Sequence, residues 1–247
     1  MTSSSADAPR VEVHHDRDAL ATAIAGELLI RLTDAQVDGG TPHVGLTGGT
    51  IAGAVHRELA RLGPDSPVDW SRVQLWWGDE RFVDAASDDR NATQAHRDFI
   101  DALPIPAEHV HELASPDDAA DVEAAAAAYA DDLRAHGTDG FEVLMLGVGE
   151  DGHVASLFPG YPQLEVTDEV AVAVRDSPKP PDERVSLTFP VLNRARSAWF
   201  LVSGDGKADA VAAALAPDGS VEHTPARGVA GTEDSIWFLD RDAASRL

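Results

Sequence analysis

Cysteine is absent from this chain of 247 residues, and lysine is almost absent. Without cysteine there can be no disulfide, no thiolate metal site and no cysteine nucleophile. Lys179 and Lys207 are the only lysines, and nineteen basic residues stand against forty-three acidic ones, a formal charge of -24. A surface of this sign disfavours nucleic acid as a partner, so any anionic ligand must be small and held locally.

Long apolar runs are also missing. No segment approaches the roughly 20 apolar residues that a membrane-spanning helix needs, and residues 1–10 are polar and lack an apolar signal core. We expect residues 1–10 to be a flexible tail and residues 11–247 a single domain. We also expect a cytoplasmic protein with no membrane partner and no obligate protein partner.

What is present is an alternation of short apolar runs with longer helical patterns, which is typical of a parallel sheet covered by helices. The runs predict buried strands at 43–46, 73–77, 141–148, 198–202 and 236–239. Helices are predicted at 16–35, 51–62, 91–102, 118–136 and 207–215. The fold class is therefore α/β, with a mainly parallel sheet.

The sequence GLTGGT at 45–50 ends one predicted strand and opens a helix. Gly48 and Gly49 let backbone N–H groups approach an anion, and Thr47 and Thr50 add hydroxyl donors at the positive end of the helix. This combination predicts a phosphate-binding loop. On two glycines alone, an ordinary strand-to-helix turn fits equally well.

Three charged residues, Asp79, Glu80 and Arg81, follow directly on the next predicted strand. In open parallel sheets ligands lie outside the carboxyl ends of the strands, so these residues are expected to face the same crevice as Thr47. Arg81 could then clamp an anion. The alternative is a solvated loop whose charges pair among themselves.

The sequence GVGEDGHVASLFPG at 147–160 contains a formal G-x-G-x-x-G pattern. A dinucleotide site is rejected, because Glu150 and Asp151 lie where a pyrophosphate would sit and Pro159 prevents the long helix that such a site needs.

The same loop instead presents His153 at a strand end, with Asp151 two residues away. A carboxylate can orient an imidazole and stabilise its protonated form, as a general base requires. Ser156 is not in a G-x-S-x-G elbow, so water is the better nucleophile. The other histidines, including the pair His109 and His111, show no accompanying ligand cluster, so no metal is expected.

A fourth segment, 179–207, contains Lys179, Arg184 and Lys207. In so acidic a chain these are candidate cations for an anionic substrate.

Taken in this order, the segments resemble the 6-phosphogluconolactonase family, which shares a superfamily with the glucosamine-6-phosphate isomerases. The loop at 147–160 looks like the family signature. It is supported by DERFV followed by Asn91, by PPDERVSLT at 180–188 and by GDGK at 204–207. The resemblance implies a modified doubly wound, Rossmann-like sheet with helices on both faces, no cofactor, and hydrolysis of 6-phospho-D-glucono-1,5-lactone in the oxidative pentose phosphate pathway.

The resemblance also implies roles for individual residues. It makes His153 the base and Asp151 its partner, with Arg81 and Lys207 as basic residues that line the site. Thr47, Gly48, Gly49 and Thr50 match the phosphate loop, and Asp79 and Glu80 match family positions without an assigned role.

Two other readings stay open. A glucosamine-6-phosphate isomerase or deaminase would need a second carboxylate near His153, and the segment from Ser156 to Pro159 lacks the Asn-Glu pair of that branch. The other is a sugar-phosphate-sensing domain that binds without turnover. The family's usual Thr-Pro after the phosphate loop is replaced by Ile51-Ala52, which removes a preset helix start but no phosphate donor.

Overall fold

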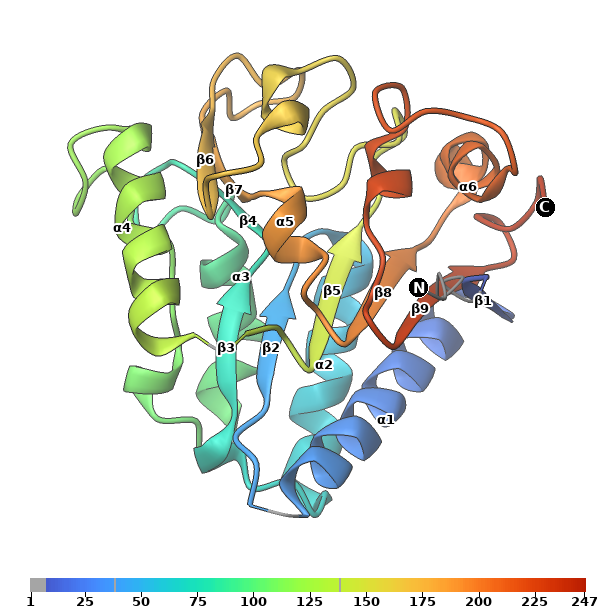
Figure 1. Cartoon of the computed structure of the whole chain (residues 1–247). Coiled ribbons are helices and arrows are strands. Elements are labelled where there is room, and N and C mark those ends of the chain that lie inside the picture. Colours follow the sequence, from blue (N-terminus) through green and yellow to red (C-terminus); the bar gives the residue numbers. More distant parts are fainter. Residues whose placement is uncertain (1–7, 38, 138) are drawn as a thin grey trace, which may run out of the picture.

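The computed structural model describes residues 8–37, 39–137 and 139–247. Within these ranges, six strands form one parallel sheet (Figure 1), and all six carboxyl ends lie at the same edge. The spatial order is β1 (Arg10–His14), β9 (Asp234–Asp240), β8 (Ser197–Val202), β5 (Val143–Gly147), β2 (His43–Leu46) and β3 (Gln74–Trp77).

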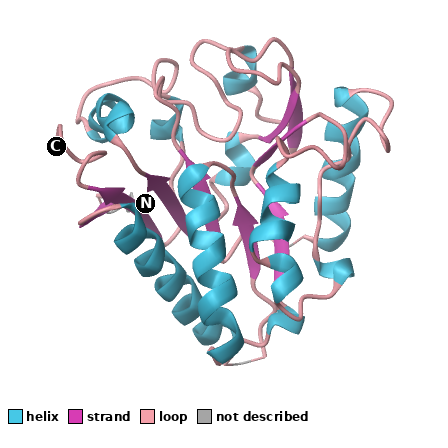
Figure 2. Ribbon diagram, turned by 180° about the vertical axis from the view of Figure 1, so that it is seen from behind, coloured by secondary structure: helices cyan, strands magenta, loops and turns pink. Residues whose placement is uncertain are grey.

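Helices cover the sheet because its strands are apolar on both faces. α1 (Arg17–Gln36), α2 (Thr50–Leu62) and α3 (Asn91–Asp98) lie side by side on one face (Figure 2). α4 (Val122–His136) lies on the other side, and α5 (Phe189–Leu192) and α6 (Ala208–Leu215) complete the set that the structure describes. No helix in the described ranges has both the length and the apolar character needed to cross a membrane.

A second, three-stranded antiparallel sheet lies beside the carboxyl edge of the first. It consists of β4 (Asp79–Arg81), β7 (Arg184–Leu187) and β6 (Ala171–Val174), and α4 packs against β6 and β7. β4 follows β3 after one residue, Gly78, so the chain passes from the large sheet straight into the small one.

The α/β class and the mainly parallel, doubly wound sheet are confirmed, and the five predicted strands are present with ends shifted by at most two residues. Two predicted helices are shorter. α4 begins at Val122 because the side chain of Asp121 caps it by accepting a hydrogen bond from the Ala124 N–H (2.8 Å). α3 ends at Asp98 because Phe99, at φ -158°, leaves the helical conformation.

The prediction missed β1 and the whole antiparallel sheet. β4 has only three residues, all charged, and therefore carries no hydrophobic alternation that would mark a strand. Of the predicted tail, residues 1–7 lie outside the described residues, and Arg10 already begins β1.

Candidate active site

The strand order determines where the predicted loops meet. β8, β5, β2 and β3 are consecutive neighbours in the sheet, and each predicted motif follows the carboxyl end of one of them or lies on the adjoining antiparallel sheet. β2 and β5 are neighbours in the sheet. The next strand along the chain from β2 is β3, which lies on one side of this pair, and the large-sheet strand that follows β5 is β8, which lies on the other side, so the strand order reverses between β2 and β5. A crevice outside such a reversal is the usual ligand site of an open parallel sheet.

A pocket of about 280 Å³ occupies this crevice. The predicted residues that line it are Thr47, Gly48, Gly49, Asp79, Arg81, His153, Arg184 and Lys207, together with the candidate cation Lys179. Three other predicted residues do not line it in the structure as described, namely Thr50, Glu80 and Asp151. The sequence motifs are therefore assembled in one place, with three members behind or beside the pocket wall.

The glycine loop between β2 and α2 opens toward this pocket. Gly49 has φ +96°, which favours glycine, and a Cβ added there would meet no atom within 4 Å. At Gly48 an added Cβ would lie 1.8 Å from Oδ1 of Asn91, so no side chain fits. Thr50 begins α2 and is exposed. The first N–H groups of this helix have no intrahelical acceptor and are free for an anion.

Thr47 connects the glycine loop to β5, the neighbouring strand in the sheet. Its Oγ1 accepts a hydrogen bond from the Gly147 N–H (3.3 Å), so the ends of β2 and β5 are joined across the crevice.

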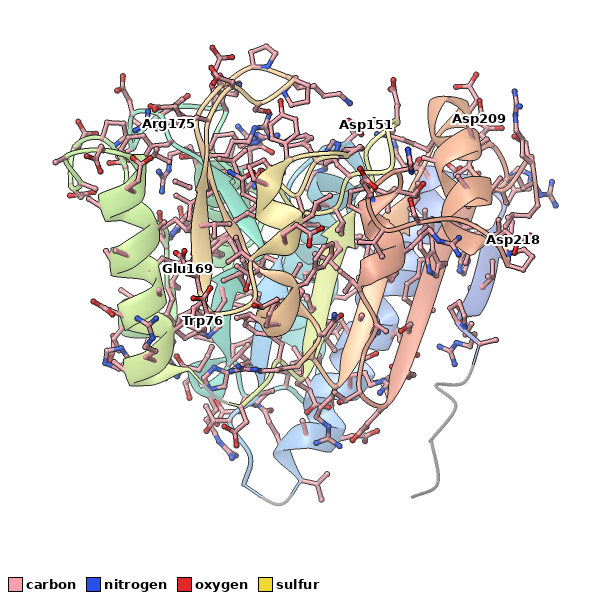
Figure 3. The ribbon with its side chains drawn as sticks, turned by 45° about the horizontal axis from the view of Figure 1, so that its top comes forward. Trp76, Asp151, Glu169, Arg175, Asp209 and Asp218 are labelled. Atoms are coloured by element: carbon pink, nitrogen blue, oxygen red, sulfur yellow. The ribbon has the colours of Figure 1, made fainter. Side chains whose placement is uncertain are left out.

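The loop after β5 holds His153 and Asp151 in contact. Nδ1 of His153 lies 2.5 Å from Oδ1 of Asp151. The turn is closed by a hydrogen bond from the Gly149 N–H to the His153 carbonyl (2.9 Å), and Gly152 takes φ +81°. A Cβ on Gly149 would lie 2.0 Å from Nδ1 of His153, so only glycine permits this packing. Figure 3 shows Asp151 above the carboxyl end of β5.

The contact fixes the charge of the carboxylate. Burial alone raises the pKa of Asp151, but the hydrogen bond and charge of His153, assisted by Lys179, outweigh it and hold that pKa at about 2. Asp151 is therefore an anion throughout the neutral range. Because Asp151 engages Nδ1, the second ring nitrogen, Nε2, is the one left for a substrate or water. The ring itself is packed against Phe158, at 4.5 Å between centroids.

Four cations line the pocket, including both lysines of the chain. Arg184 is held by the backbone: it donates to the carbonyls of residues 179, 180 and 181. Arg81 donates from Nη1 to the Asp89 carbonyl, and its Nε is buried without a partner in the described residues. Burial and Lys179 lower the pKa of Lys207, against the opposing charges of Glu150 and Asp151. A chain of net charge -24 thus contains a local site suited to an anion.

Asp79 and Glu80 point to different surroundings, as successive residues of a strand do. Asp79 lines the pocket, and its Oδ2 accepts a hydrogen bond from the Ser156 hydroxyl (2.6 Å). Ser156 is fully buried, in keeping with the expectation that it is not the nucleophile.

Glu80 was expected at the substrate, and the structure places it elsewhere. Its carboxylate accepts hydrogen bonds from the backbone N–H groups of Arg81, Asn91 and Ala92, each at 2.8 Å, and so caps the start of α3. Burial raises the pKa of Glu80 to about 7 against these three donors. Glu80 therefore holds the start of α3 and does not face the pocket. Side chains alternate along β4, and it is the neighbouring Asp79 that faces the pocket.

Asn91 is a pocket residue that the residue-by-residue reasoning did not select. Its Nδ2 donates to the Asp79 carbonyl (2.9 Å), and the side chain fills the space beside Gly48. The only signal for it in the sequence was its place after DERFV in the family pattern.

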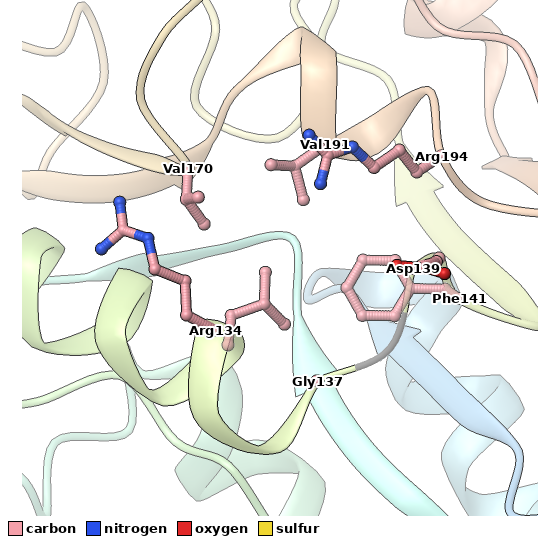
Figure 4. Close-up of a pocket in the computed structure, with 9 residues that line it drawn as sticks. Arg134, Gly137, Asp139, Phe141, Val170, Val191 and Arg194 are labelled. Atoms are coloured by element: carbon pink, nitrogen blue, oxygen red, sulfur yellow. The ribbon is translucent and has the colours of Figure 1, made fainter.

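A larger pocket, about 440 Å³, lies near the amino ends of the strands and is shown in Figure 4. Arg134 and Arg194 lie on opposite sides of it, around Phe141, Val170 and Val191. It contains no histidine and none of the predicted site residues. Size alone therefore does not identify the site here.

The prediction that His111 has no ligand cluster is wrong. Asp132 and His136 lie next to it, and their ligand atoms are all within 4.8 Å of one another. The spacing argument failed because both partners are on α4, more than twenty residues away in the sequence.

Comparisons with known proteins show the family of this chain. The profile of the family described as glucosamine-6-phosphate isomerases/6-phosphogluconolactonase matches residues 15–237. A 6-phosphogluconolactonase of Streptomyces coelicolor is 42% identical over 250 residues, which cover 98% of this chain and 95% of that protein.

Two solved structures share the fold. The 6-phosphogluconolactonase of Thermotoga maritima has a TM-score of 0.82 at 26% identity and covers 94% of this chain and 99% of its own. A monomeric glucosamine-6-phosphate deaminase has a TM-score of 0.80 at 20% identity, covering 96% of this chain and 100% of its own, a likeness of fold alone. From the profile match and the close relative, the chain belongs to the glucosamine-6-phosphate isomerase/6-phosphogluconolactonase family.

Proposed function

We propose that this protein is a 6-phosphogluconolactonase that hydrolyses 6-phospho-D-glucono-1,5-lactone to 6-phospho-D-gluconate in the oxidative pentose phosphate pathway. The observation that carries the proposal is the environment of His153. Its Nδ1 is fixed by ionised Asp151, and its ring lines a pocket with four cations. The name of the Streptomyces coelicolor relative, 42% identical along nearly the whole chain, supports the substrate.

His153 acts first as a base and then as an acid. Nε2 accepts a proton from water while the water oxygen attacks the lactone carbonyl carbon, and the carbonyl oxygen becomes an oxyanion. When the carbonyl re-forms, the bond to the ring oxygen breaks, and the imidazolium returns its proton to that oxygen. Asp151 stabilises the imidazolium between the two steps and holds the ring in the required tautomer. The products are a hydroxyl group and a carboxylic acid, which releases its proton to solvent and is a carboxylate at neutral pH.

The cations divide between the two ends of the substrate. Lys207 lines the pocket with His153, and a Cβ on the preceding Gly206 would lie 3.4 Å from Oε1 of Glu150 in the His153 loop, so Lys207 is on the His153 side and stabilises the oxyanion. Arg81, beside the start of α3, joins the backbone N–H groups of Gly48 and Gly49 and of the α2 N-terminus in binding the phosphate. The reaction needs no cofactor, since each step is a proton transfer or a displacement at carbon.

The decisive experiment measures lactone hydrolysis above the spontaneous background, with and without the 6-phosphate on the substrate. We expect kcat/KM to be at least about a hundredfold higher with the phosphate, from charge-assisted contacts at the glycine loop. Equal rates on both lactones would remove the phosphate from the proposal. If the enzyme gives no rate above the spontaneous background, the proposed activity is wrong.

The phosphate loop is tested separately with Gly49→Val, which places bulk in the open space before α2. We expect KM for the phosphorylated lactone to rise about tenfold or more, with a smaller change in kcat. Gly160→Val is the matched control, because Gly160 also has positive φ and open space around it but lies outside the pocket. An equal rise in KM for both variants would count against the loop.

The position of Asp79 favours deamination of an amino-sugar phosphate as a second candidate activity. Asp79 is a carboxylate that lines the same pocket as His153, and an amino-sugar-phosphate deaminase needs a carboxylate for proton transfer. Release of ammonia from glucosamine 6-phosphate, without lactone hydrolysis, would favour that reaction. Binding of either compound without turnover would favour a sensing domain. A cytoplasmic location and the absence of protein, membrane and nucleic-acid partners stay predictions.

A further inference from the structure

A second group of histidine and carboxylate side chains lies between β3 and α4, outside the catalytic pocket. His111, Asp132 and His136 each offer one ligand atom, and these atoms lie within 4.8 Å of one another. None of the three residues lines the pocket at His153. Two imidazoles and one carboxylate form the donor set of many zinc sites, with water in the fourth position.

The two imidazoles contact the same carboxylate, one at each oxygen. Nδ1 of His111 lies 3.0 Å from one oxygen of Asp132, and Nδ1 of His136 lies 2.7 Å from the other. Two ligand atoms on one tetrahedral zinc are about 3.3 Å apart, given bond lengths of about 2.0–2.1 Å. The two histidine–aspartate distances would therefore lengthen by about 0.3 Å and 0.6 Å when the ion binds, and all three ligand atoms already lie within 4.8 Å of one another. Asp132 and His136 are four residues apart on α4 and lie on the same side of it.

The most buried ligand is already held in place. The His111 ring stacks on Trp76, at 3.7 Å between centroids and 3° between planes, and its backbone N–H donates to the Leu75 carbonyl. Figure 3 shows Trp76 on the side of the molecule where α4 lies. The His111 side chain is 8% exposed, Asp132 31% and His136 65%, so the cluster runs from the core to the surface and solvent can reach its outer end.

The second nitrogen of His111 is consistent with a metal ligand. In the tautomer that is protonated at Nε2, this nitrogen donates to Oε1 of Gln74 at 2.9 Å. The lone pair of Nδ1 then faces a carboxylate oxygen, and two acceptors at 3.0 Å repel each other unless a cation lies between them. A second proton would put a charge on a nearly buried ring, which costs desolvation. Metal-binding histidines commonly donate their other N–H to such an oxygen.

We infer that His111, Asp132 and His136 form a binding site for a divalent transition metal, with zinc as the expected ion. The metal connects α4 to the segment that runs along edge strand β3, where Val110 bridges Leu75. Its role is to stabilise this edge of the sheet, since the site contains no residue of the catalytic pocket. The inference is independent of the proposed function.

The experiment titrates the full, tag-free chain with Zn²⁺ by calorimetry and by thermal unfolding. We expect a one-to-one site and a Tm increase of several degrees at saturating zinc. Co²⁺ provides a second probe, because a four-coordinate N,N,O site gives visible absorption bands, and no thiolate in this chain can contribute to them. His136→Ala and Asp132→Asn should each weaken binding at least tenfold. Both change partly exposed side chains, so folding is retained and is checked by circular dichroism.

Two controls separate this site from other histidines. His15→Ala removes an exposed histidine that contacts a single carboxylate, Asp16, at 2.9 Å, and should leave zinc affinity unchanged. His153→Ala should also retain the site, which excludes binding at the catalytic pair. The inference is overturned if zinc fails to bind up to millimolar concentration. It is equally overturned if the folded His136→Ala and Asp132→Asn proteins bind zinc as the wild type does, or if His153→Ala abolishes binding.

Discussion

Two of the histidine–aspartate contacts among the described residues, His153–Asp151 and His111–Asp132, pair the same kinds of side chain in different surroundings. At His153, Nδ1 meets Asp151 and Nε2 makes no hydrogen bond to a described residue, which leaves that nitrogen for chemistry. At His111, Nδ1 meets Asp132, Nε2 meets Gln74, and the carboxylate is shared with His136. The first arrangement fits proton transfer and the second fits a metal. The two sites differ most at Nε2, the ring nitrogen that does not contact the aspartate.

The largest effect is expected from His153→Ala. Loss of a positioned general base should lower kcat by about a hundredfold to ten-thousandfold, with less change in KM. Steady-state lactone hydrolysis, corrected for the spontaneous rate, measures this. The matched change at the other cluster, His136→Ala, should leave kcat within about twofold. A folded His153→Ala enzyme with near-native kcat, together with an inactive Glu150→Gln enzyme, would transfer the role of base to Glu150.

The next effect tests the packing that brings His153 and Asp151 together. In Gly149→Ala the new Cβ would lie 2.0 Å from Nδ1 of His153 and 2.4 Å from Oδ1 of Asp151, so both side chains must shift. Misplacing a catalytic group by about 1 Å can cost about a hundredfold, and we expect a loss of kcat of this order. Gly26→Ala in α1 is the control, since no atom lies within 4 Å of its added Cβ and alanine favours a helix. Native kcat in Gly149→Ala would show that the contact is dispensable.

The two pairs also show what the sequence could predict. Asp151 and His153 are two residues apart, so their contact follows from the local loop, and the parallel sheet follows from apolar runs that are buried on both faces. The partners of His111 come from a helix that only the tertiary fold places beside it, and no spacing rule reaches them. Long-range side-chain contacts of this kind require the structure.

Glu80 shows the same limit inside the motif at 79–81. The sequence placed Asp79, Glu80 and Arg81 at the right strand end, and Asp79 and Arg81 line the pocket. It could not show that the chain continues there as strand β4, whose alternation turns Glu80 toward the start of α3. A strand is predicted from an alternation of apolar and polar residues, and three consecutive charged residues show no such alternation, so they resemble a loop.

A smaller effect is expected from Asp151→Asn, because the ring loses its orienting anion but keeps its base. We expect kcat to fall roughly tenfold, less than in His153→Ala. The pKa of Asp151 in the folded protein, about 2, lies below the ordinary 3.8, so the carboxylate contributes stability above pH 4 that is lost as the pH falls toward 2. Urea unfolding should give a stability difference between wild type and variant at pH 5 that shrinks below pH 4. A difference that stays unchanged from pH 5 to pH 2 would contradict this assignment.

The smallest expected effect on catalysis is that of removing metal. EDTA should change kcat by less than about twofold while abolishing any thermal stabilisation by zinc, because the two histidine–aspartate contacts then serve separate purposes. In the part of the chain that the structure describes, His153 is the only histidine that lines the pocket, and the four cations around it repel a divalent ion. At His111 two imidazoles share one carboxylate, and no lysine or arginine makes an ion pair with it among the described residues. Parallel measurements of kcat and Tm, before and after chelation, test both statements on one sample. If EDTA abolished activity and one specific divalent ion restored it, His153 and Asp151 would be metal ligands. The proposed proton transfer through Nε2 would then give way to a metal-bound water.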